Sequence, residues 1–339
     1  MISVKKHGIV LEKRNISLEI EGVLNPAVIL DNDIIYMFYR AVAKGNKSSI
    51  FCCTFSDPLT VLKRSDAPIL KSEFDYESHG VEDPRIVKID NLFYLTYCAY
   101  NGDAAFGALT TSSDLKHFQK IGIIVPMVRG DNFRSWLKCN DFVNDKYCQL
   151  NISNNFVWDK NMMFFPRRIG GKLVFLHRIK PGIQIIFINE IAELNDGYWR
   201  EYLSNLEKHI VMDPKFDHEL SYIGGGCPPI ETEFGWLLIY HGVHDILNGY
   251  KYVACAALLD LENPTIELAR LPYPLFEPEK SWELKGFVNN VCFPTGAIVV
   301  KNVLYIYYGA ADERIACASI SMSVLLKELL LNKTNKSKT

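Results

Sequence analysis

The feature that most constrains the fold of this chain is a weak internal repeat. Five times along the 339 residues, a cluster of turn-forming residues leads into an apolar, aromatic run that ends in small or polar residues. Asn, Asp and Gly tolerate positive φ angles, and β-branched and aromatic residues favour strands, so each repeat predicts a β-hairpin. The five runs are Ile34–Ala41, Leu92–Tyr100, Lys172–Arg178, Trp236–Val243 and Val303–Ala311.

Each run is followed by a second segment of small and apolar residues, which predicts the return strand of the hairpin. The repeats recur roughly every 60 to 80 residues, a spacing that accommodates three or four short strands and is typical of propeller blades. The sequence therefore predicts an all-β fold, a five-bladed β-propeller that forms a single domain over residues 1–339. A pair of β-sandwich domains is the alternative architecture.

Signals for helices are sparse in this chain. Apolar residues at helical spacing predict a C-terminal helix over residues 321–331, with Ser321 as its N-cap and a flexible tail over residues 332–339. The charged N-terminal segment lacks the apolar stretch of a signal peptide. It is expected to add an outer strand that closes the ring of blades.

Charge and cysteine content narrow the class of partner and the compartment. The formal net charge is −2 and no basic tract is present, which argues against nucleic acid and anionic membranes as partners. Nine scattered cysteines without a CxxC pair indicate reduced thiols, and therefore a cytoplasmic protein. The N-terminal segment or the C-terminal helix could serve a homo-oligomer, whose existence the sequence leaves open.

The stretch Gly80–Ile86 packs two carboxylates and a guanidinium around a proline. Pro84 fixes its own φ angle and favours an extended or turn conformation for Asp83, which is expected at the entrance of a strand. A fixed carboxylate beside Arg85 suits a sugar-processing site, so Arg85 is expected to contact the substrate. The simpler interpretation is a turn with a surface ion pair of little energetic weight.

Polar residues end the apolar run of every repeat. In a propeller these equivalent positions lie near the axis, so together they predict one polar pocket that also contains Asp83. A single buried histidine or arginine is more often structural, but polar residues at the same place in every repeat favour a binding site. The residues that we expect in this pocket are Arg40, Tyr97, Arg178, His241 and Asp312.

The cationic members of this set predict a site for a compact anion. Arg178 presents a fork of donors suited to phosphate, and Lys160 adds a point charge. His241 and His244 have HxxH spacing, but no third ligand accompanies them, so no metal is expected. The predicted anion ligands are Lys160, Asn161, Arg178 and His241.

Taken in order, these motifs resemble glycoside hydrolase family 130, the β-mannoside phosphorylases and related β-mannosidases. The similarity runs from about Gly22 to about Ile320, and the order and number of the motifs make it specific. The motifs are Asn25-Pro26-Ala27, Tyr39-Arg40-Ala41, Glu82-Asp83-Pro84-Arg85, Lys160-Asn161, Phe165-Pro166, Leu176-His177-Arg178, Ile223-Gly224-Gly225-Gly226, Pro228-Pro229, Tyr240-His241-Gly242, Ala257-Leu258-Leu259-Asp260, Phe293-Pro294 and Tyr308-Gly309-Ala310-Ala311-Asp312.

The resemblance implies a five-bladed propeller that cleaves a β-mannosidic bond with inversion. It implies Asp83 as the general acid, acting through the 3-hydroxyl of the mannosyl unit. Inorganic phosphate would be the nucleophile, without any cofactor, and α-mannose 1-phosphate the product. An inverting displacement needs one acid and a nucleophile on the opposite face, and phosphate needs no protein base. The implied mannose ligands are Asn25, Arg40, Tyr97 and Asp312, and the implied phosphate ligands are Lys160, Asn161, Arg178 and His241.

Two positions depart from the pattern of the family's phosphorylases. Tyr222 stands where they usually carry Lys, so it could donate a hydrogen bond to phosphate but brings no charge. Lys160 stands where Arg is common. Hydrolases of the family lack parts of the basic set and activate water with a carboxylate, for which Glu219 or Asp217 would be the candidates. Three of the four basic positions remain, which favours phosphorolysis.

Three functions are therefore open. The first is a phosphorylase acting on manno-oligosaccharides, β-1,2- or β-1,4-linked, and the second is an inverting exo-β-mannosidase. The third is a non-catalytic carbohydrate-binding propeller, which Asp83 in its Pro-Arg context disfavours because a lectin needs no general acid. The linkage and the acceptor sugar depend on rim loops whose shapes the sequence does not fix.

Overall fold

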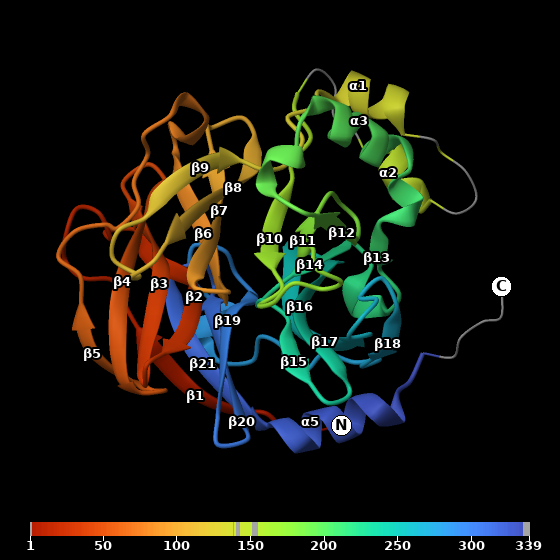
Figure 1. Ribbon diagram of the computed structural model, residues 1–339. Coiled ribbons are helices and arrows are strands. Elements are labelled where there is room, and N and C mark those ends of the chain that lie inside the picture. The colour runs from red at the N-terminus through yellow and green to blue at the C-terminus, as the bar shows by residue number, and fades with distance from the viewer. Residues whose placement is uncertain (1, 138, 140–142, 151–154, 335–339) are drawn as a thin grey trace.

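The structure, a computed structural model, describes residues 2–137, 139, 143–150 and 155–334. It is mostly β, with short helices at the periphery (Figure 1). All five predicted hairpins are present. Their turns use the residues that the sequence suggested, since Asn32 and Asp33 have φ angles of 48° and 62° and Lys301 and Asn302 have φ angles of 48° and 63°.

Two antiparallel meanders share the largest sheet. They join where β4 runs parallel to β6 through a single pair, Ser48 with Gly80. The first meander consists of β2 (Gly22–Asp31), β3 (Ile34–Ala43), β4 (Lys47–Asp57) and β5 (Thr60–Arg64). The second consists of β6 (Gly80–Ile89), β7 (Leu92–Tyr100), β8 (Ala105–Ser112) and β9 (Gln119–Ile123).

The remaining described strands form three sheets, with the orders β10-β11-β12-β13, β14-β16-β17-β18 and β1-β21-β20-β19. β15 pairs with β16 at the side of the second. Their bounds are β10 (Lys160–Phe164), β11 (Leu173–Arg178), β12 (Ile183–Ile188), β13 (Ile210–Met212), β14 (Tyr222–Gly225), β15 (Ile230–Thr232), β16 (Gly235–Ile246), β17 (Gly249–Leu259), β18 (Glu267–Arg270), β19 (Cys292–Val300), β20 (Val303–Ala310), β21 (Arg314–Ser321) and β1 (Lys5–Leu11).

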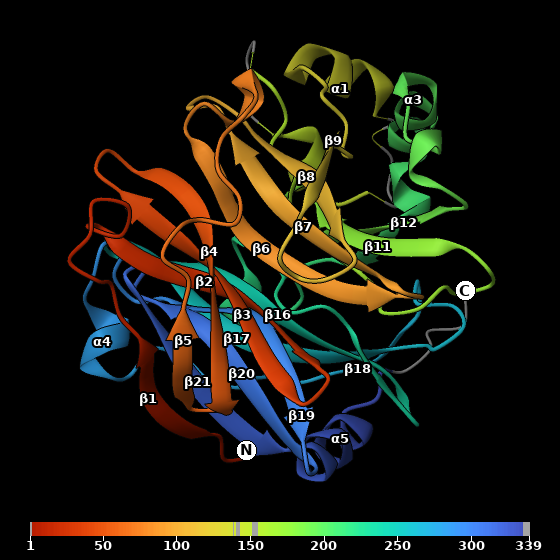
Figure 2. The same cartoon turned by 60° about the vertical axis from the view of Figure 1, so that its left-hand side comes forward.

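These strands define five units in chain order: β2–β5, β6–β9, β10–β13, β14–β18, and β19–β21 with β1. The first strands of successive units touch, because β2 contacts β6, β6 contacts β10 and β10 contacts β14. β19 contacts β16 and β17 of the fourth unit and β2 of the first. The expected outer strand from the N-terminus is present, since β1 pairs antiparallel with β21 (Figure 2).

Hydrophobic clusters of described residues fill the spaces between successive units. Side chains alternate across a strand, so consecutive residues of one strand enter different clusters. In β3, Met37 and Tyr39 pack between the first and fifth units, whereas Phe38 packs between the first and second. In β16, Ile239 packs between the fourth and fifth units, whereas Leu238 packs between the third and fourth. Both faces of each sheet are therefore buried.

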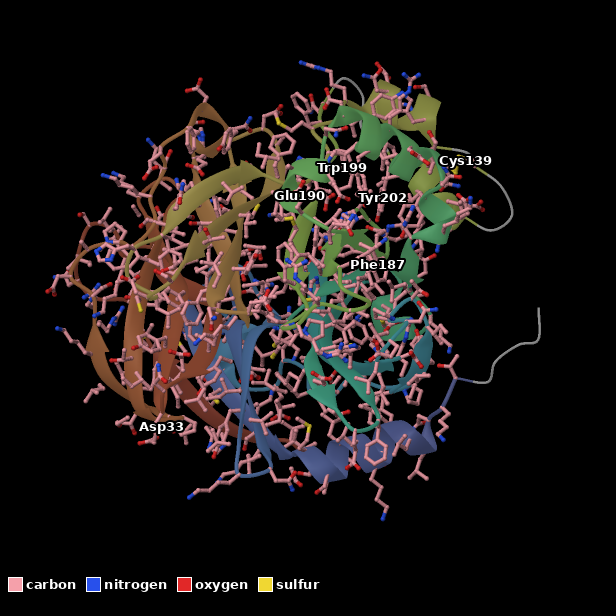
Figure 3. All side chains as sticks on the ribbon, viewed as in Figure 1. Asp33, Cys139, Phe187, Glu190, Trp199 and Tyr202 are labelled. Carbon is pink, nitrogen blue, oxygen red and sulfur yellow. A yellow bond between two sulfur atoms is a disulfide. The ribbon has the colours of Figure 1, made fainter. Side chains whose placement is uncertain are left out.

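Short helices lie against the third, fourth and fifth units. α1, α2 and α3 lie beside β11–β13, where Trp199 and Tyr202 of α3 pack in one cluster with Phe175 of β11 (Figure 3). The helices are α1 (Gly130–Trp136), α2 (Asp145–Cys148), α3 (Asp196–Ser204), α4 (Ser281–Leu284) and α5 (Met322–Leu331), with 3-10 helices η1 (Asp75–Glu77), η2 (Ile191–Glu193), η3 (Leu206–Lys208) and η4 (Asp217–Glu219).

The C-terminal helix is confirmed with Ser321 at the N-cap position, although its side chain forms no capping hydrogen bond. The tail beyond it differs in part from the expectation of flexibility. The amide of Thr334 donates to the carbonyl of Leu268, and Lys333 pairs with Ala269, so residues 332–334 run beside β18. Residues 335–339 lie outside the described part of the chain. None of the described helices is long and apolar enough to cross a membrane.

One expectation about the cysteines is wrong. Cys139 and Cys148 form a disulfide, whereas the other seven cysteines are free (Figure 3). The two residues are nine positions apart without a CxxC motif, so the spacing carried no signal. α2 brings Cys148 back toward Cys139, and their Cα atoms lie 6.1 Å apart, within the usual range for a disulfide.

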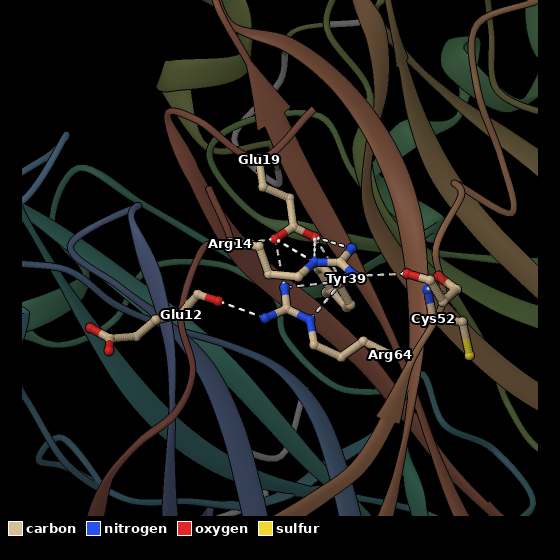
Figure 4. A network of polar contacts seen from close by, with 7 residues as sticks. Glu12, Arg14, Glu19, Tyr39, Cys52 and Arg64 are labelled. Carbon is tan, nitrogen blue, oxygen red and sulfur yellow. Dashed lines mark hydrogen bonds and ion pairs between the residues drawn. The ribbon is translucent and has the colours of Figure 1, made fainter. Parts of the chain in front are cut away.

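A buried carboxylate ties the N-terminal segment to the first unit (Figure 4). Glu19 accepts hydrogen bonds from Arg14 (2.8 Å), Arg64 (2.7 Å) and the hydroxyl of Tyr39 (2.9 Å). Burial alone would raise the pKa of Glu19, but the hydrogen bonds from Arg14 and the charge of Arg64 outweigh it and lower the pKa below its usual value. Glu19 therefore remains ionised and holds two cations that come from different segments.

We predict that Glu19→Ala lowers the free energy of unfolding by about 3 kcal/mol, because it leaves two partly buried cations without their counter-ion. Urea denaturation at pH 7 measures this loss. The difference from wild type should shrink as pH falls through the depressed pKa of Glu19, where the carboxyl becomes protonated. Glu12→Ala is the matched control, since Glu12 contributes only its carbonyl to Arg64. An equal loss in both variants would contradict the assignment.

Candidate active site

β-bulges in the first strands of three units present polar side chains to the same cavity. In each ladder the pairing skips two residues, and the first of them has a left-handed φ angle between 48° and 57°. Asn and Asp adopt this conformation more readily than other non-glycine residues, and a bulge re-aims a side chain. The skipped pairs are Asn25-Pro26 in β2, Asp83-Pro84 in β6 and Asn161-Met162 in β10.

The conformation of Asp83 corrects the sequence-based prediction. Asp83 lies inside β6 and has a φ angle of 48°, whereas an extended or turn conformation at a strand entrance was expected. Pro84 occupies the unpaired second position of the bulge, where its missing N–H costs no ladder hydrogen bond. The proline therefore marks a bulge in this sequence and not the beginning of a strand.

The second strands contribute Arg and His side chains at paired positions beside the first strands. Arg40 of β3 pairs with the residue before the first bulge, and Arg178 of β11 pairs with Lys160 before the third. His241 of β16 pairs with Gly224. The repeat predicted that these three residues are equivalent. Each of them pairs with the first strand of its own unit, and this position brings all three to the same cavity.

The bulges and these positions line one cavity of about 570 Å³. Its lining includes residues from every unit, and therefore from segments far apart in the sequence. The predicted site residues that line it are Asn25, Arg40, Asp83, Lys160, Asn161, Arg178, Tyr222, His241 and Asp312.

Carboxylates and their cations occupy one part of this cavity, which we call the acidic half. Oδ1 of Asp83 accepts from Asn25 (2.8 Å) and Arg40 (3.3 Å), whereas no described residue bonds to Oδ2. Arg40 also pairs with Glu82 at 2.7 Å, and Lys160 Nζ lies 3.9 Å from the other oxygen of Glu82. Asp83 is therefore held in place through one oxygen, and the other is available to a ligand.

Two carboxyl groups in the acidic half differ in pKa. Burial alone would raise the pKa of Asp83, but the charges of Arg40 and Lys160 and the hydrogen bond from Asn25 outweigh it, so its pKa lies below the usual value. Burial raises the pKa of Asp312 to about 6, and the charge of Asp83 acts in the same direction. Such a separation of pKa values is a common property of catalytic carboxyl pairs.

Polar groups without partners occupy the other part of the cavity, which we call the basic half. The buried Nε of Arg178, Nδ1 of His241 and Oδ1 of Asn161 form no hydrogen bond within the described residues. None of the described carboxylates lies within ion-pair distance of Arg178. The Nε of Arg178 is a charged donor, and buried donors without partners are rare in folded proteins, so this half is suited to an anionic ligand.

Arg85 and Tyr97 do not line the cavity, in contrast to the expectation. Arg85 lies behind Asp83, where its guanidinium donates to the carbonyls of Asp83 (3.1 Å) and Pro84 (2.9 Å) and to that of Gly226. The hydroxyl of Tyr97 donates to buried Glu77 at 2.6 Å. Arg85 thus fixes the backbone of the bulge, and Tyr97 belongs to the neighbouring core.

Glu219 and Asp217 also lie outside the cavity lining. Glu219 is fully buried and accepts from Tyr240, from Arg270 (3.2 Å) and from the amide of Lys215 (2.8 Å), while Asp217 is exposed on η4. Neither carboxylate can therefore activate a water molecule in the cavity. The hydrolase alternative loses both of its proposed bases.

One group of described residues has ligand atoms close enough to hold a metal ion. The atoms of His218, Glu219 and Cys255 lie within 4.8 Å of one another. The carboxylate of Glu219 is already bonded to Arg270 and Tyr240, and burial raises the pKa of the Cys255 thiol well above its usual value. The cluster therefore offers neither a free carboxylate nor a thiolate to a cation.

Sequence reasoning missed several residues of the cavity. Lys180, Tyr252 and Trp158 line it, yet they occupy loops or strand positions without a counterpart in the other repeats. A smaller cavity of about 240 Å³ shares Arg40 and Asp312 with the main one and is also lined by Trp158 and Tyr100. The shapes of the loops bring these residues together, and no sequence motif predicts their positions.

A cavity with a carboxylate cluster on one side and an unpaired guanidinium on the other is the kind of site that a carbohydrate-active enzyme can use. The chain belongs to glycoside hydrolase family 130. The family model described as β-1,4-mannooligosaccharide phosphorylase matches residues 4–330.

Two relatives from Thermoanaerobacter sp. (strain X514) support this membership. A 1,2-β-oligomannan phosphorylase is 32% identical over 335 residues, which cover 95% of this chain and 98% of the relative. A β-1,2-mannobiose phosphorylase is 35% identical over 318 residues, covering 89% and 91% of the two chains. The solved β-1,2-mannobiose phosphorylase of Listeria innocua has the same fold, with a TM-score of 0.75 at 22% identity, covering 98% of this chain and 100% of that one.

We predict that Asp312→Asn stabilises the protein at alkaline pH. With a pKa of about 6 in the folded state, against an ordinary value of 3.8, ionisation of Asp312 opposes folding at higher pH. The variant should therefore gain about 3 kcal/mol in free energy of unfolding at pH 8 and little at pH 4. Urea denaturation across this range measures the gain, with exposed Asp103→Asn as the control. A pH-independent difference would exclude the raised pKa.

Proposed function

We propose that this chain catalyses the inverting phosphorolysis of β-mannosides and releases α-mannose 1-phosphate. The observation that carries the proposal is the division of one cavity into an acidic half at Asp83 and a basic half at Arg178. The first half supplies an acid and fixed donors for the sugar, and the second supplies unpaired donors for phosphate. Phosphate is the co-substrate, and no other cofactor is needed.

The roles of the residues follow from their contacts. Asp83 delivers the proton through its free Oδ2, and Asn25 and Arg40 keep its carboxyl oriented. The mannosyl unit lies between these residues and Asp312. Phosphate lies against Arg178, His241 and Asn161, where a nucleophile would attack the anomeric carbon opposite the leaving group. The cavity pre-organises both reactants, which is the main contribution a protein makes to such a displacement.

Phosphate binding itself prepares Asp83 to act as an acid. In the free site, Arg40 and Lys160 hold the pKa of Asp83 below its usual value, so the carboxyl is ionised. A phosphate dianion in the basic half adds negative charge nearby and raises that pKa again. The proton therefore enters the site together with the nucleophile, and the acid is formed only in the ternary complex.

We infer a β-1,2 linkage for the natural substrate. The two relatives named above, which this chain matches over nearly their whole lengths, are both named for β-1,2-linked substrates. The smaller cavity beside the main one would hold the acceptor sugar, since Trp158 and Tyr100 offer aromatic faces and Arg40 and Asp312 offer polar groups.

We further infer that the five units are the blades of a propeller around the cavity. The order of contacts between their first strands and the position of β1 beside β21 support this architecture. We assign the enzyme to the cytoplasm, where the charge of a sugar phosphate opposes its loss through a bilayer. The disulfide Cys139–Cys148 is the feature that speaks against this compartment.

Sugar release from a panel of β-1,2-, β-1,3- and β-1,4-mannobiose, with and without inorganic phosphate, tests the proposed reaction. We expect mannose 1-phosphate from the β-1,2-linked sugar only when phosphate is present. Asp83→Asn should remove this activity, because it preserves the shape of the bulge and removes the acid. Free mannose released at the same rate without phosphate would instead identify a hydrolase.

Replacing Arg178 tests the basic half directly. Arg178→Ala should reduce phosphate-dependent turnover by ~10²-fold or more, because it removes a charge contact to the transition state. Initial rates over a range of phosphate concentrations measure the change. Asp217→Asn serves as the matched control and should turn over like the wild type. Loss of activity in the control with retention in Arg178→Ala would favour water activation by a carboxylate.

A further inference from the structure

We propose that Lys180 supplies the second positive charge of the phosphate subsite and takes the place of the lysine that Tyr222 replaces. The inference rests on the proposed phosphorolysis and assigns a specificity-determining residue to its nucleophile site. Lys180 lies in the turn between β11 and β12, two residues after Arg178.

The charges of the basic half are insufficient without Lys180. Burial, together with the charges of Arg178 and Arg85, lowers the pKa of His241 well below its usual value, so this imidazole is neutral. Lys160 is directed to the acidic half, where it lies 3.9 Å from Glu82. Tyr222 brings no charge, and Arg178 therefore stands as the only charged member of the predicted phosphate ligands that has no acidic partner among the described residues.

The position of Lys180 provides a second positive charge in the basic half. Its Nζ lies 3.7 Å from the ring centroid of Tyr222, and the guanidinium of Arg178 lies 5.2 Å from the same centroid. Lys180 lines the cavity with Arg178, and no described carboxylate forms an ion pair with it. The Arg178 guanidinium and the Lys180 ammonium therefore both lie over the ring of Tyr222, and both residues line the same cavity.

Tyr222 acts as the support for these cations. Its hydroxyl is hydrogen-bonded at 2.5 Å to that of Tyr252 on β17, which lies beyond β16 in the same sheet, and this contact fixes the ring. A lysine at position 222 would extend its own ammonium from β14 into the cavity. Tyr222 instead holds the ammonium of Lys180, from the turn after β11, against the face of its ring. A positive charge is therefore retained at this place although position 222 is a tyrosine.

The electrostatics of Lys180 agree with an anion site. Desolvation in the cavity, together with the charges of Arg178 and Lys160, lowers the pKa of Lys180 to about 7. The residue as a whole keeps an exposed surface, so solvent moderates the desolvation, while the repulsion from the neighbouring cations persists. Bound phosphate relieves that repulsion, which is the gain in free energy that such a cluster offers to an anion.

A charge-relocation experiment tests the assignment. The variants are Lys180→Ala, the double variant Lys180→Ala with Tyr222→Lys, and exposed Lys172→Ala as a matched control. KM for phosphate is measured at saturating β-1,2-mannobiose, KM for the sugar at saturating phosphate, and phosphate affinity without sugar by calorimetry. Lys180→Ala should raise the KM for phosphate by about 10- to 100-fold and leave that for the sugar unchanged. The double variant should recover most of the loss.

An unchanged KM for phosphate in Lys180→Ala, or an equal rise in both KM values, would overturn the assignment. The double variant guards against loss of folding, because recovery requires a folded site. Failure of the proposed function has a different signature, since the wild type would then release mannose without phosphate. Even in that case, calorimetry of phosphate alone decides whether Lys180 binds the anion.

Discussion

Burial of both faces of every sheet is the constraint on which this structure depends. Consecutive residues of a strand enter different hydrophobic clusters, so a polar side chain in a regular strand needs a buried partner or access to a cavity. Polar side chains reach the central cavity where the alternation is interrupted, where a strand ends, and at the paired positions of Arg40 and His241. The bulges at Asn25, Asp83 and Asn161 are such interruptions. The cavity and its chemistry therefore arise from local exceptions to the rule that builds the core.

The electrostatic division of the cavity follows from the residues that each unit contributes to it. In the first two units Asn25 and Arg40 bind one oxygen of Asp83, and Arg40 also pairs with Glu82. In the third and fourth units Arg178 and His241 have no acidic partners among the described residues. One half is thus nearly self-sufficient, while the other is completed by a ligand.

The strands could be predicted from sequence because each hairpin carries its own signal. Turn residues such as Asn32 and Asp33 and the aromatic runs beside them act over a few positions. The site was predictable only as far as the repeats and the family resemblance reached. Arg85 and Tyr97 share the chemistry of the site but face backbone and core, and Lys180 was missed because its position depends on packing against Tyr222. The disulfide had no recognisable spacing, so only the folded chain reveals it.

The pairing of β1 with β21 joins residues that are almost the whole chain apart, as Lys5 opposite Ser319 shows. During synthesis the first strand leaves the ribosome long before its partner exists, and it must wait unpaired until the last sheet is made. Such a non-local closure slows folding. A nascent chain without its final segment retains open sheet edges, which other chains could occupy. The sheet of the fifth unit is therefore complete only when β1 and β21 are both present and paired.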